Sequence, residues 1–161
     1  MINLNMGVEV RLHSVHEWND AVDVARRIMT LHAPTYDNAR EYEHARDVLA
    51  ALVLHTLVAG NGKSLTELRD LLLCDADAPA TILLHLLHRG IMERQWDDGE
   101  QATRRCLHQT VQAILACSED EQNVTLENIR AHIMICDYPI FAKNVVWSEE
   151  PLRDAALADR R

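Results

Sequence analysis

Apolar residues recur at intervals of three and four along most of the chain, the spacing that gathers side chains on one face of an α-helix. The first stripe predicts a helix over about residues 15–31, with these apolar positions: Val15, Trp18, Val22, Ala25, Ile28 and Met29. A second helix is expected over about residues 36–59, and its second half is apolar on nearly every side. Because such a helix has no face suited to water, we expect it at the centre of the fold.

Two serine-led signatures mark the starts of further helices. Residues 64–67 and 118–121 both read S-x-x-E, the capping box in which the serine and the glutamate each bind a backbone amide that the helix leaves free. They predict one helix that ends near Cys74 and another that ends near Cys136. The sequence contains no internal repeat of fixed period.

The segment between these signatures predicts two more helices. One should begin at Pro79, a residue favoured in the first turn, and should end at Gly90. The side chains expected on its buried side are Ile82, Leu83, Leu86 and Leu87. The other helix should cover about residues 100–116, and the tail from Ile140 is given no single state. The chain is therefore predicted to be all-α, a single compact bundle of about six or seven helices.

Composition agrees with one domain and narrows the class of partner. The 161 residues are 48% hydrophobic, enough for one sizeable core, and the formal charge is -9 with a pI near 5.4. A strong grip on nucleic-acid phosphates depends on clustered Lys and Arg, so we do not expect strong direct DNA binding. A basic protein partner fits better, although an acidic surface also serves solubility alone.

The cysteines and the apolar runs predict a cytoplasmic protein. Cys74, Cys106, Cys117 and Cys136 are far apart, without a CxxC pair or a secretory leader. The longest apolar run, residues 48–59, is well short of the roughly 20 residues that a membrane span needs. We therefore expect no disulfide framework and no contact with a membrane.

Several residue patterns resemble catalytic or metal-binding motifs but are incomplete. Residues 60–64 read GNGKS, like the end of a phosphate-binding loop, but Leu57 stands where that motif needs glycine. His85 and His88 share a helix face without the further ligands of a zinc site, and His55 is expected to be a hydrogen-bonded core residue. Cys106 and His108 lack a third orienting group. We expect no catalytic residue, no cofactor and no metal.

Acidic residues gather at two places that are separated by one predicted helix. The candidate partner-binding residues are Asp97, Asp98 and Glu100 in the first cluster, and Glu119, Asp120 and Glu121 in the second. A purely structural explanation stays open, because the positive end of a helix dipole favours carboxylates at a helix start. The clusters would act as separate patches, since a helix of about 17 residues is near 25 Å long.

Three segments resemble the all-α domain that coupling proteins of type IV secretion systems insert into their RecA-like motor, in the TraG/TraD-like family of conjugative coupling ATPases. The first is Trp18-Asn19-Asp20-Ala21 with Ala25. The second covers residues 42–52, similar to the family's aromatic-x-x-Ala-Arg-x-Leu-Leu-Ala-Ala-Leu helix, with residues 64–72 as its serine-capped successor. The third covers residues 118–130 and then Asp137-Tyr138-Pro139.

The resemblance implies a binding module and no enzyme. In that family the domain reads a transfer signal on a relaxase with its DNA strand, or on an effector or toxin protein, at the cytoplasmic face of the bacterial inner membrane. It then presents the cargo to the motor and the secretion channel. Residues 1–161 would be this one domain, with 1–14 and 141–161 as junctions to the parent ATPase. The alternative is a free-standing helical adaptor or regulator, which a helix after Phe141 would favour.

Overall fold

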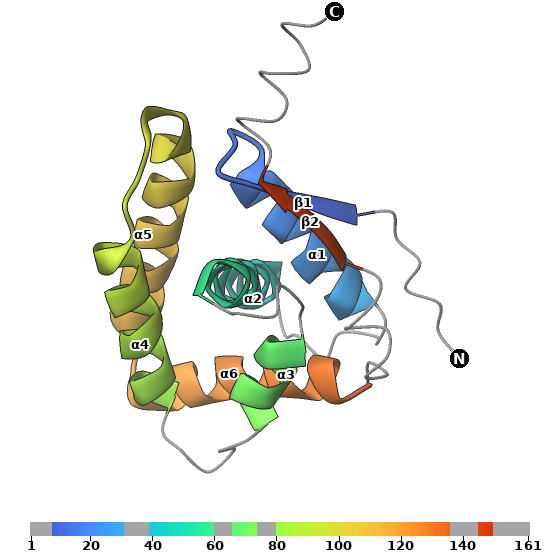
Figure 1. Ribbon diagram of the computed structural model, residues 1–161. Helices are drawn as coiled ribbons and strands as arrows, with labels where there is room; N and C mark the ends of the chain where they lie inside the picture. The colour runs from blue at the N-terminus through green and yellow to red at the C-terminus, as the bar shows by residue number, and fades with distance from the viewer. Residues whose placement is uncertain (1–7, 31–38, 60–65, 74–79, 136–144, 150–161) are drawn as a thin grey trace, which may run out of the picture.

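The computed structural model describes residues 8–30, 39–59, 66–73, 80–135 and 145–149 (Figure 1). Six α-helices lie within these ranges: α1 (Glu17–Thr30), α2 (Ala39–Ala59), α3 (Thr66–Leu73), α4 (Ala80–Glu93), α5 (Gln101–Leu115) and α6 (Glu119–Ile135). A single 3-10 turn, η1 (Asp98–Glu100), leads into α5. The predicted all-α bundle of about six helices is confirmed. None of the described helices is long and apolar enough to cross a membrane.

Helix α2 forms the centre of the bundle, as its sequence predicts. Figure 1 shows it end-on, with α1 on one side, α4 and α5 on the other, and α3 and α6 below. Every residue from Val48 to Leu54 is at most 1% exposed, which is burial on all sides over about two turns. Each fully buried Leu or Val contributes roughly 1.5–3 kcal/mol relative to an exposed one, so this helix supplies much of the core.

Helix α4 differs from its prediction in its length and in its buried face. It continues through Gly90 to Glu93, so the expected end at Gly90 is wrong. Its buried residues are Ala80, Leu84, Leu87 and Ile91, whereas Ile82 and Leu86 are 63% and 43% exposed. Buried and exposed positions of this helix both carry large apolar side chains, so periodicity alone does not select the face that packs. Val15 is also 63% exposed, because it precedes α1 and does not belong to its stripe.

Gly90 lies at a close approach between helices. A Cβ atom on Gly90 would lie 2.7 Å from Nδ1 and 2.9 Å from Cε1 of His55 on α2. Such distances are too short for a side chain, so glycine lets α4 pass directly over the imidazole. The residue that the sequence marks as a helix end therefore serves helix packing.

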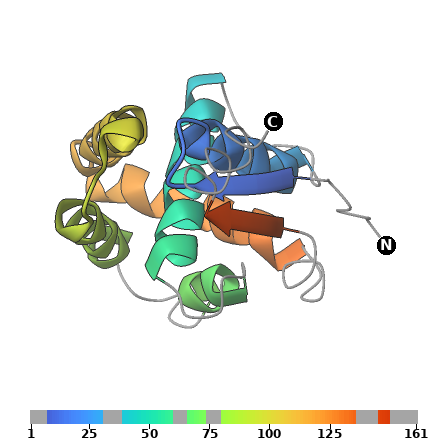
Figure 2. The same ribbon diagram turned by 45° about the horizontal axis from the view of Figure 1, so that its top comes forward.

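Two short strands join segments from opposite ends of the described chain. Strand β1 (Val8–Leu12) pairs in parallel with β2 (Val145–Glu149), from Val8 opposite Val145 to Leu12 opposite Glu149 (Figure 2). The whole helical bundle lies between them in sequence, and Figure 1 shows both strands over α1. The helical periodicity of the chain does not predict this sheet. It places the segment before α1 beside the segment after α6.

Of the two predicted capping serines, one lies within the described residues. The Oγ atom of Ser118 accepts a hydrogen bond of 3.2 Å from the backbone N–H of Glu121, which confirms Ser118 as the cap of α6. Ser64 and the GNGKS segment lie outside the described residues, as do Cys74 and Cys136.

Candidate functional site

The turn between β1 and α1 places His13 in an uncommon backbone conformation. His13 has a φ of 61°, and its N–H donates to Oε2 of Glu17 in the first turn of α1. The hydroxyl of Ser14 donates to the carbonyl of Arg11 at 2.6 Å and accepts from the N–H of His16 at 3.1 Å. These local side-chain bonds stabilise the turn that joins β1 to α1.

A second contact binds β1 to α1. The guanidinium of Arg11 forms a two-point pair with the carboxylate of Asp20, with Nε–Oδ2 at 2.9 Å and Nη2–Oδ1 at 3.0 Å. The backbone N–H of Arg11 donates to the same carboxylate at 3.0 Å. Asp20 is only 7% exposed, so the pair is partly shielded from solvent. The strand is therefore fixed to the helix by side chains as well as by the turn.

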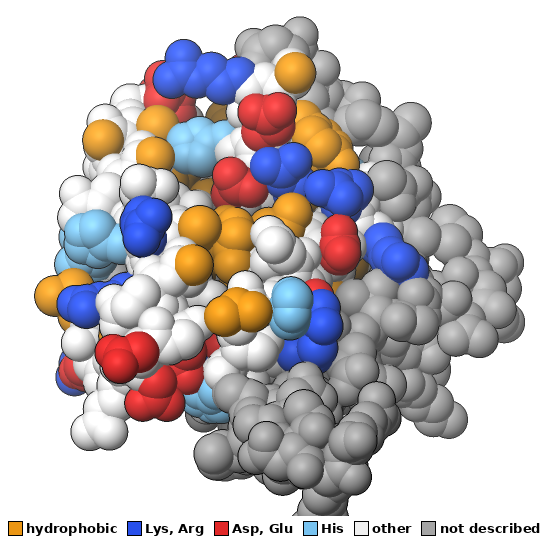
Figure 3. All heavy atoms as spheres, turned by 90° about the horizontal axis from the view of Figure 1, so that it is seen from above, with side chains coloured by type: hydrophobic (Ala, Val, Ile, Leu, Met, Phe, Trp, Pro, Cys, Tyr) orange, Lys and Arg blue, Asp and Glu red, His pale blue; other side chains and the backbone are white. Residues whose placement is uncertain are grey.

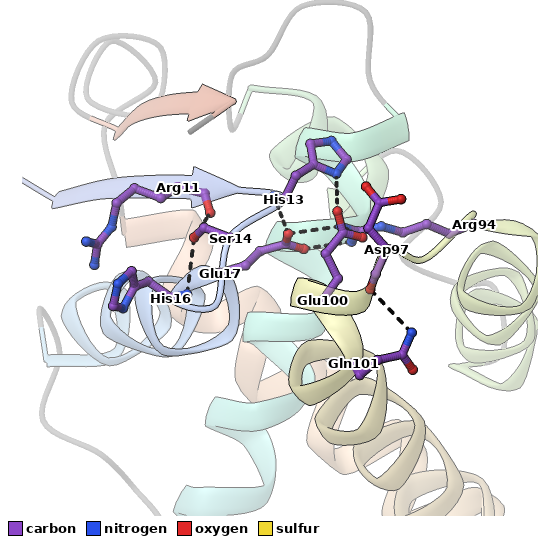
Figure 4. Close-up of polar contacts among 9 residues, drawn as sticks. All are labelled: Arg11, His13, Ser14, His16, Glu17, Arg94, Asp97, Glu100 and Gln101. Atoms are coloured by element: carbon purple, nitrogen blue, oxygen red, sulfur yellow. Dashed lines mark hydrogen bonds and ion pairs between the residues drawn. The ribbon is translucent and has the colours of Figure 1, made fainter. Parts of the chain in front are cut away.

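Four charged or ionisable side chains meet beneath this turn, and we call them the buried ion cluster: His13, Glu17, Arg94 and Glu100 (Figure 4). Arg94, just after α4, lies 2.7 Å from Oε1 and 2.9 Å from Oε2 of Glu17 and 3.4 Å from Oε2 of Glu100. Nδ1 of His13 lies 2.8 Å from Oε1 of Glu100. Glu17 and Glu100 are 0% and 1% exposed. The cluster joins β1 and α1 to the connection between α4 and α5.

Ion pairing with Arg94 explains the geometry of the buried ion cluster. Two carboxylates that are both removed from water need positive charge close by, and Arg94 supplies it to both. Donor atoms of His13, Glu17 and Glu100 lie within 4.8 Å of one another, close enough for metal ligation. A metal would have to displace the guanidinium from Glu17, so ion pairing accounts for the arrangement without one.

Glu100 is buried, whereas the role in partner binding expected from the sequence requires an exposed carboxylate. The structure places its carboxylate inside the buried ion cluster, while its neighbours Asp97 and Asp98 are exposed. The second acidic group, Glu119, Asp120 and Glu121, is exposed in the first turn of α6. Helix α5 separates the two groups, so these described residues form two separate acidic sites.

A cavity of about 520 Å³ adjoins the buried ion cluster, and we call it the α2–α4 cavity. Its wall is mainly apolar and includes Leu54, Val58, Leu86, Leu87, Ile91 and Trp96. His13 and Arg94 line it as well, so they belong to both features. In Figure 3, seen from above, apolar side chains are exposed among charges of both signs. The volume lies in the range of small-molecule and side-chain binding sites.

Trp96 and His55 shape two sides of this cavity. The indole Nε1 of Trp96 donates to the carbonyl of Ile91 at 3.1 Å, and the guanidinium carbon of Arg94 lies 4.1 Å from the Trp96 ring centroid. These contacts fix the ring in place. His55 also lines the cavity, and burial lowers its pKa below the ordinary value of 6.5. Its charged form is therefore disfavoured in the folded protein.

The other histidines and cysteines do not gather into a site within the described residues. His85 is exposed, and the ring of His88 lies 6.2 Å from that of His108 on α5. Burial raises the pKa of the Cys106 thiol, the opposite of the shift that activates a nucleophile. The pKa of Cys117 is raised too, first by burial and then by its contact with Glu121.

Sequence reasoning missed the buried ion cluster, although one signal was present. Residues 14–17 read S-x-x-E, the same form as the two capping boxes that were recognised. It marks the start of α1 and the carboxylate of Glu17. The other contacts of the cluster are distant in sequence: Arg94 lies 77 residues from Glu17, and Glu100 lies 87 residues from His13.

Comparisons with protein families, with curated proteins and with solved structures found no match for the chain.

Proposed function

We propose that the protein is the cytoplasmic substrate-recognition module of a type IV secretion coupling protein. It binds the transfer signal of a relaxase–DNA complex or of an effector protein and presents that cargo to the motor and the channel. It works by binding, and the chemistry of ATP hydrolysis belongs to the motor. The observation that carries this proposal is the pairing of β1 with β2.

A module inserted in a motor needs its two connections close together. The parallel pairing of residues 8–12 with 145–149 sets the segments on either side of the bundle next to each other. Arg11 and His13 then fix β1 to α1 and to the α4–α5 connection. In such a module, cargo binding on the helices would be coupled to the motor through the two strands.

The distribution of charge supports a basic signal as the cargo feature that is read. The chain has a formal charge of -9, and Asp97, Asp98 and residues 119–121 present carboxylates at its surface. Opposite charges speed encounter and fix register more than they add affinity. The signal should therefore associate quickly at low salt and more slowly at physiological salt.

The competing proposal, a free-standing adaptor, would be supported by a helix after Phe141. Residues 145–149 form a strand of the sheet with β1, and this arrangement favours an inserted module. An adaptor would also have no reason to bind secreted cargo selectively. The two proposals therefore differ in the identity of the partner.

The immobilised chain should retain secreted relaxases or effectors from a cell with a type IV secretion system. Proteins of similar charge that are not secreted should pass through. A chain with Asp97→Lys and Asp98→Lys serves as the charge control and should retain less cargo. Retention that follows partner charge alone, with no preference for secreted proteins, would contradict the proposal.

A further inference from the structure

Arg89 and Arg94, the two arginines that line the α2–α4 cavity, are already paired with acids within the protein. Arg89 pairs with Glu93 at 2.9 Å, one turn further along α4. Arg94 is held by Glu17 and Glu100. Burial lowers the pKa of His55 and so disfavours its charged form. The cavity therefore offers no free positive charge from these residues to an anionic ligand.

Glu93 lines the cavity and pairs with Arg89, whereas the two acids that follow Trp96 in sequence are in the opposite state. Asp97 and Asp98 directly follow Trp96, which lines the cavity, and both are exposed. Within the described part of the chain, neither carboxylate forms an ion pair. The edge next to Trp96 is thus negative and unneutralised, so it complements a cation.

The cavity wall includes exposed apolar side chains. Val58 on α2 and Leu86 on α4 are 37% and 43% exposed, and both line the cavity. Trp96 adds a large ring whose N–H is already bonded to the carbonyl of Ile91, so the indole can offer apolar surface without an unsatisfied donor. An apolar wall with a fixed aromatic ring is the usual setting for a side-chain anchor.

We propose that the α2–α4 cavity binds a large apolar side chain of a cationic peptide segment, while Asp97 and Asp98 pair with Lys or Arg residues flanking that anchor. This inference rests on the proposed function, and it names the part of the transfer signal that is read and the place that reads it. A second copy of this chain is a poorer occupant, since its cavity edge carries the same negative charge.

The test uses fluorescence anisotropy with a labelled peptide rich in arginine and leucine. Leu86→Gln should weaken binding about tenfold, the scale for losing an anchoring contact. Ile82→Gln is the matched control: it makes a similar change on the same helix at a side chain that is 63% exposed and outside the cavity. It should leave the affinity unchanged.

The charge arm compares the two acidic groups. The double variant Asp97→Asn and Asp98→Asn should weaken binding several-fold at low salt and reduce its salt dependence. The matched pair Glu119→Gln and Asp120→Asn, in the first turn of α6, should do neither. A peptide with alanine for leucine, or glutamate for arginine, should lose affinity for the unchanged protein.

Equal effects of Leu86→Gln and Ile82→Gln would overturn the assignment of the cavity. So would a concentration-dependent dimer that Leu86→Gln dissolves, because the cavity would then be a self-interface. Failure of this inference is distinguishable from failure of the proposed function. Secreted cargo that still binds every cavity variant with unchanged affinity removes the cavity and leaves the function standing.

Discussion

Replacing Arg94 with methionine keeps most of the side-chain volume and removes the charge that two buried carboxylates share. Glu17 and Glu100 are 0% and 1% exposed, and Arg94 itself is 9% exposed. Loss of one partner from a buried ion pair leaves an uncompensated charge and costs roughly 3–5 kcal/mol. The stacking of Arg94 on Trp96 is lost as well. We expect the free energy of unfolding to fall by at least about 3 kcal/mol.

The matched control is Arg26→Met. Arg26 pairs with Asp23 at 3.1 Å, but both side chains are about half exposed, at 51% and 52%. Exposed pairs contribute about 0–1 kcal/mol, so this change should be nearly silent. Urea unfolding followed by circular dichroism measures both variants. At about 2–4 °C per kcal/mol for a domain of this size, the Arg94 variant should also melt at least roughly 6 °C lower.

A rescue variant separates charge from shape. Combining Arg94→Met with Glu17→Gln and Glu100→Gln removes the stranded charges and should recover part of the lost stability, since neutral groups cost less to bury. Arg94→Met and Arg26→Met variants that unfold at the same urea concentration would refute the account of the buried ion cluster.

Three further predictions concern packing, titration and capping. Gly90→Ala should destabilise the fold by up to about 2 kcal/mol, because overpacking costs about 1–3 kcal/mol against a gain of about 1 kcal/mol in helix propensity. Gly99→Ala is the control and should not destabilise it, because a Cβ atom there meets nothing within 4 Å. Equal shifts of the melting temperature in the two variants would contradict this explanation. Because the pKa of His55 is lowered in the folded state, the unfolded state binds the proton more readily, and the free energy of unfolding should fall as the pH drops below about 6.5. His55→Gln should flatten that slope in urea titrations between pH 7 and about pH 5, and an unchanged slope would exclude His55 as its source. Ser118→Ala should cost about 1 kcal/mol, measured by urea unfolding, and Ser118→Asn should restore most of it.

The helices were predictable because their information is local. Periodic apolar residues and the Ser118 cap specify α1, α2, α5 and α6 within a residue or a few of the observed bounds. The central position of α2 also followed from the sequence, since a helix that is apolar on all sides is buried on all sides. The face of α4 did not follow, because its apolar residues leave several faces that could pack.

The sheet and the buried ion cluster depend on contacts that local patterns do not encode. Strands β1 and β2 have five residues each and pair across nearly the whole chain. In the sequence, Glu100 is indistinguishable from the neighbouring surface acids Asp97 and Asp98. Only the fold places His13 and Arg94 against its carboxylate. Its burial is a consequence of tertiary structure, so a charge pattern alone assigns it to the surface.

The affinity of the chain for a secreted relaxase or effector, with and without its transfer signal, tests the central proposal most directly. Isothermal titration calorimetry at low and physiological salt would measure it, with a signal in which Lys and Arg are replaced by glutamine as the charge control. We expect binding that requires the signal, that weakens with salt, and that is lost with the glutamine version. Equal affinity for cargo with and without its signal would contradict the assignment of this protein as a recognition module.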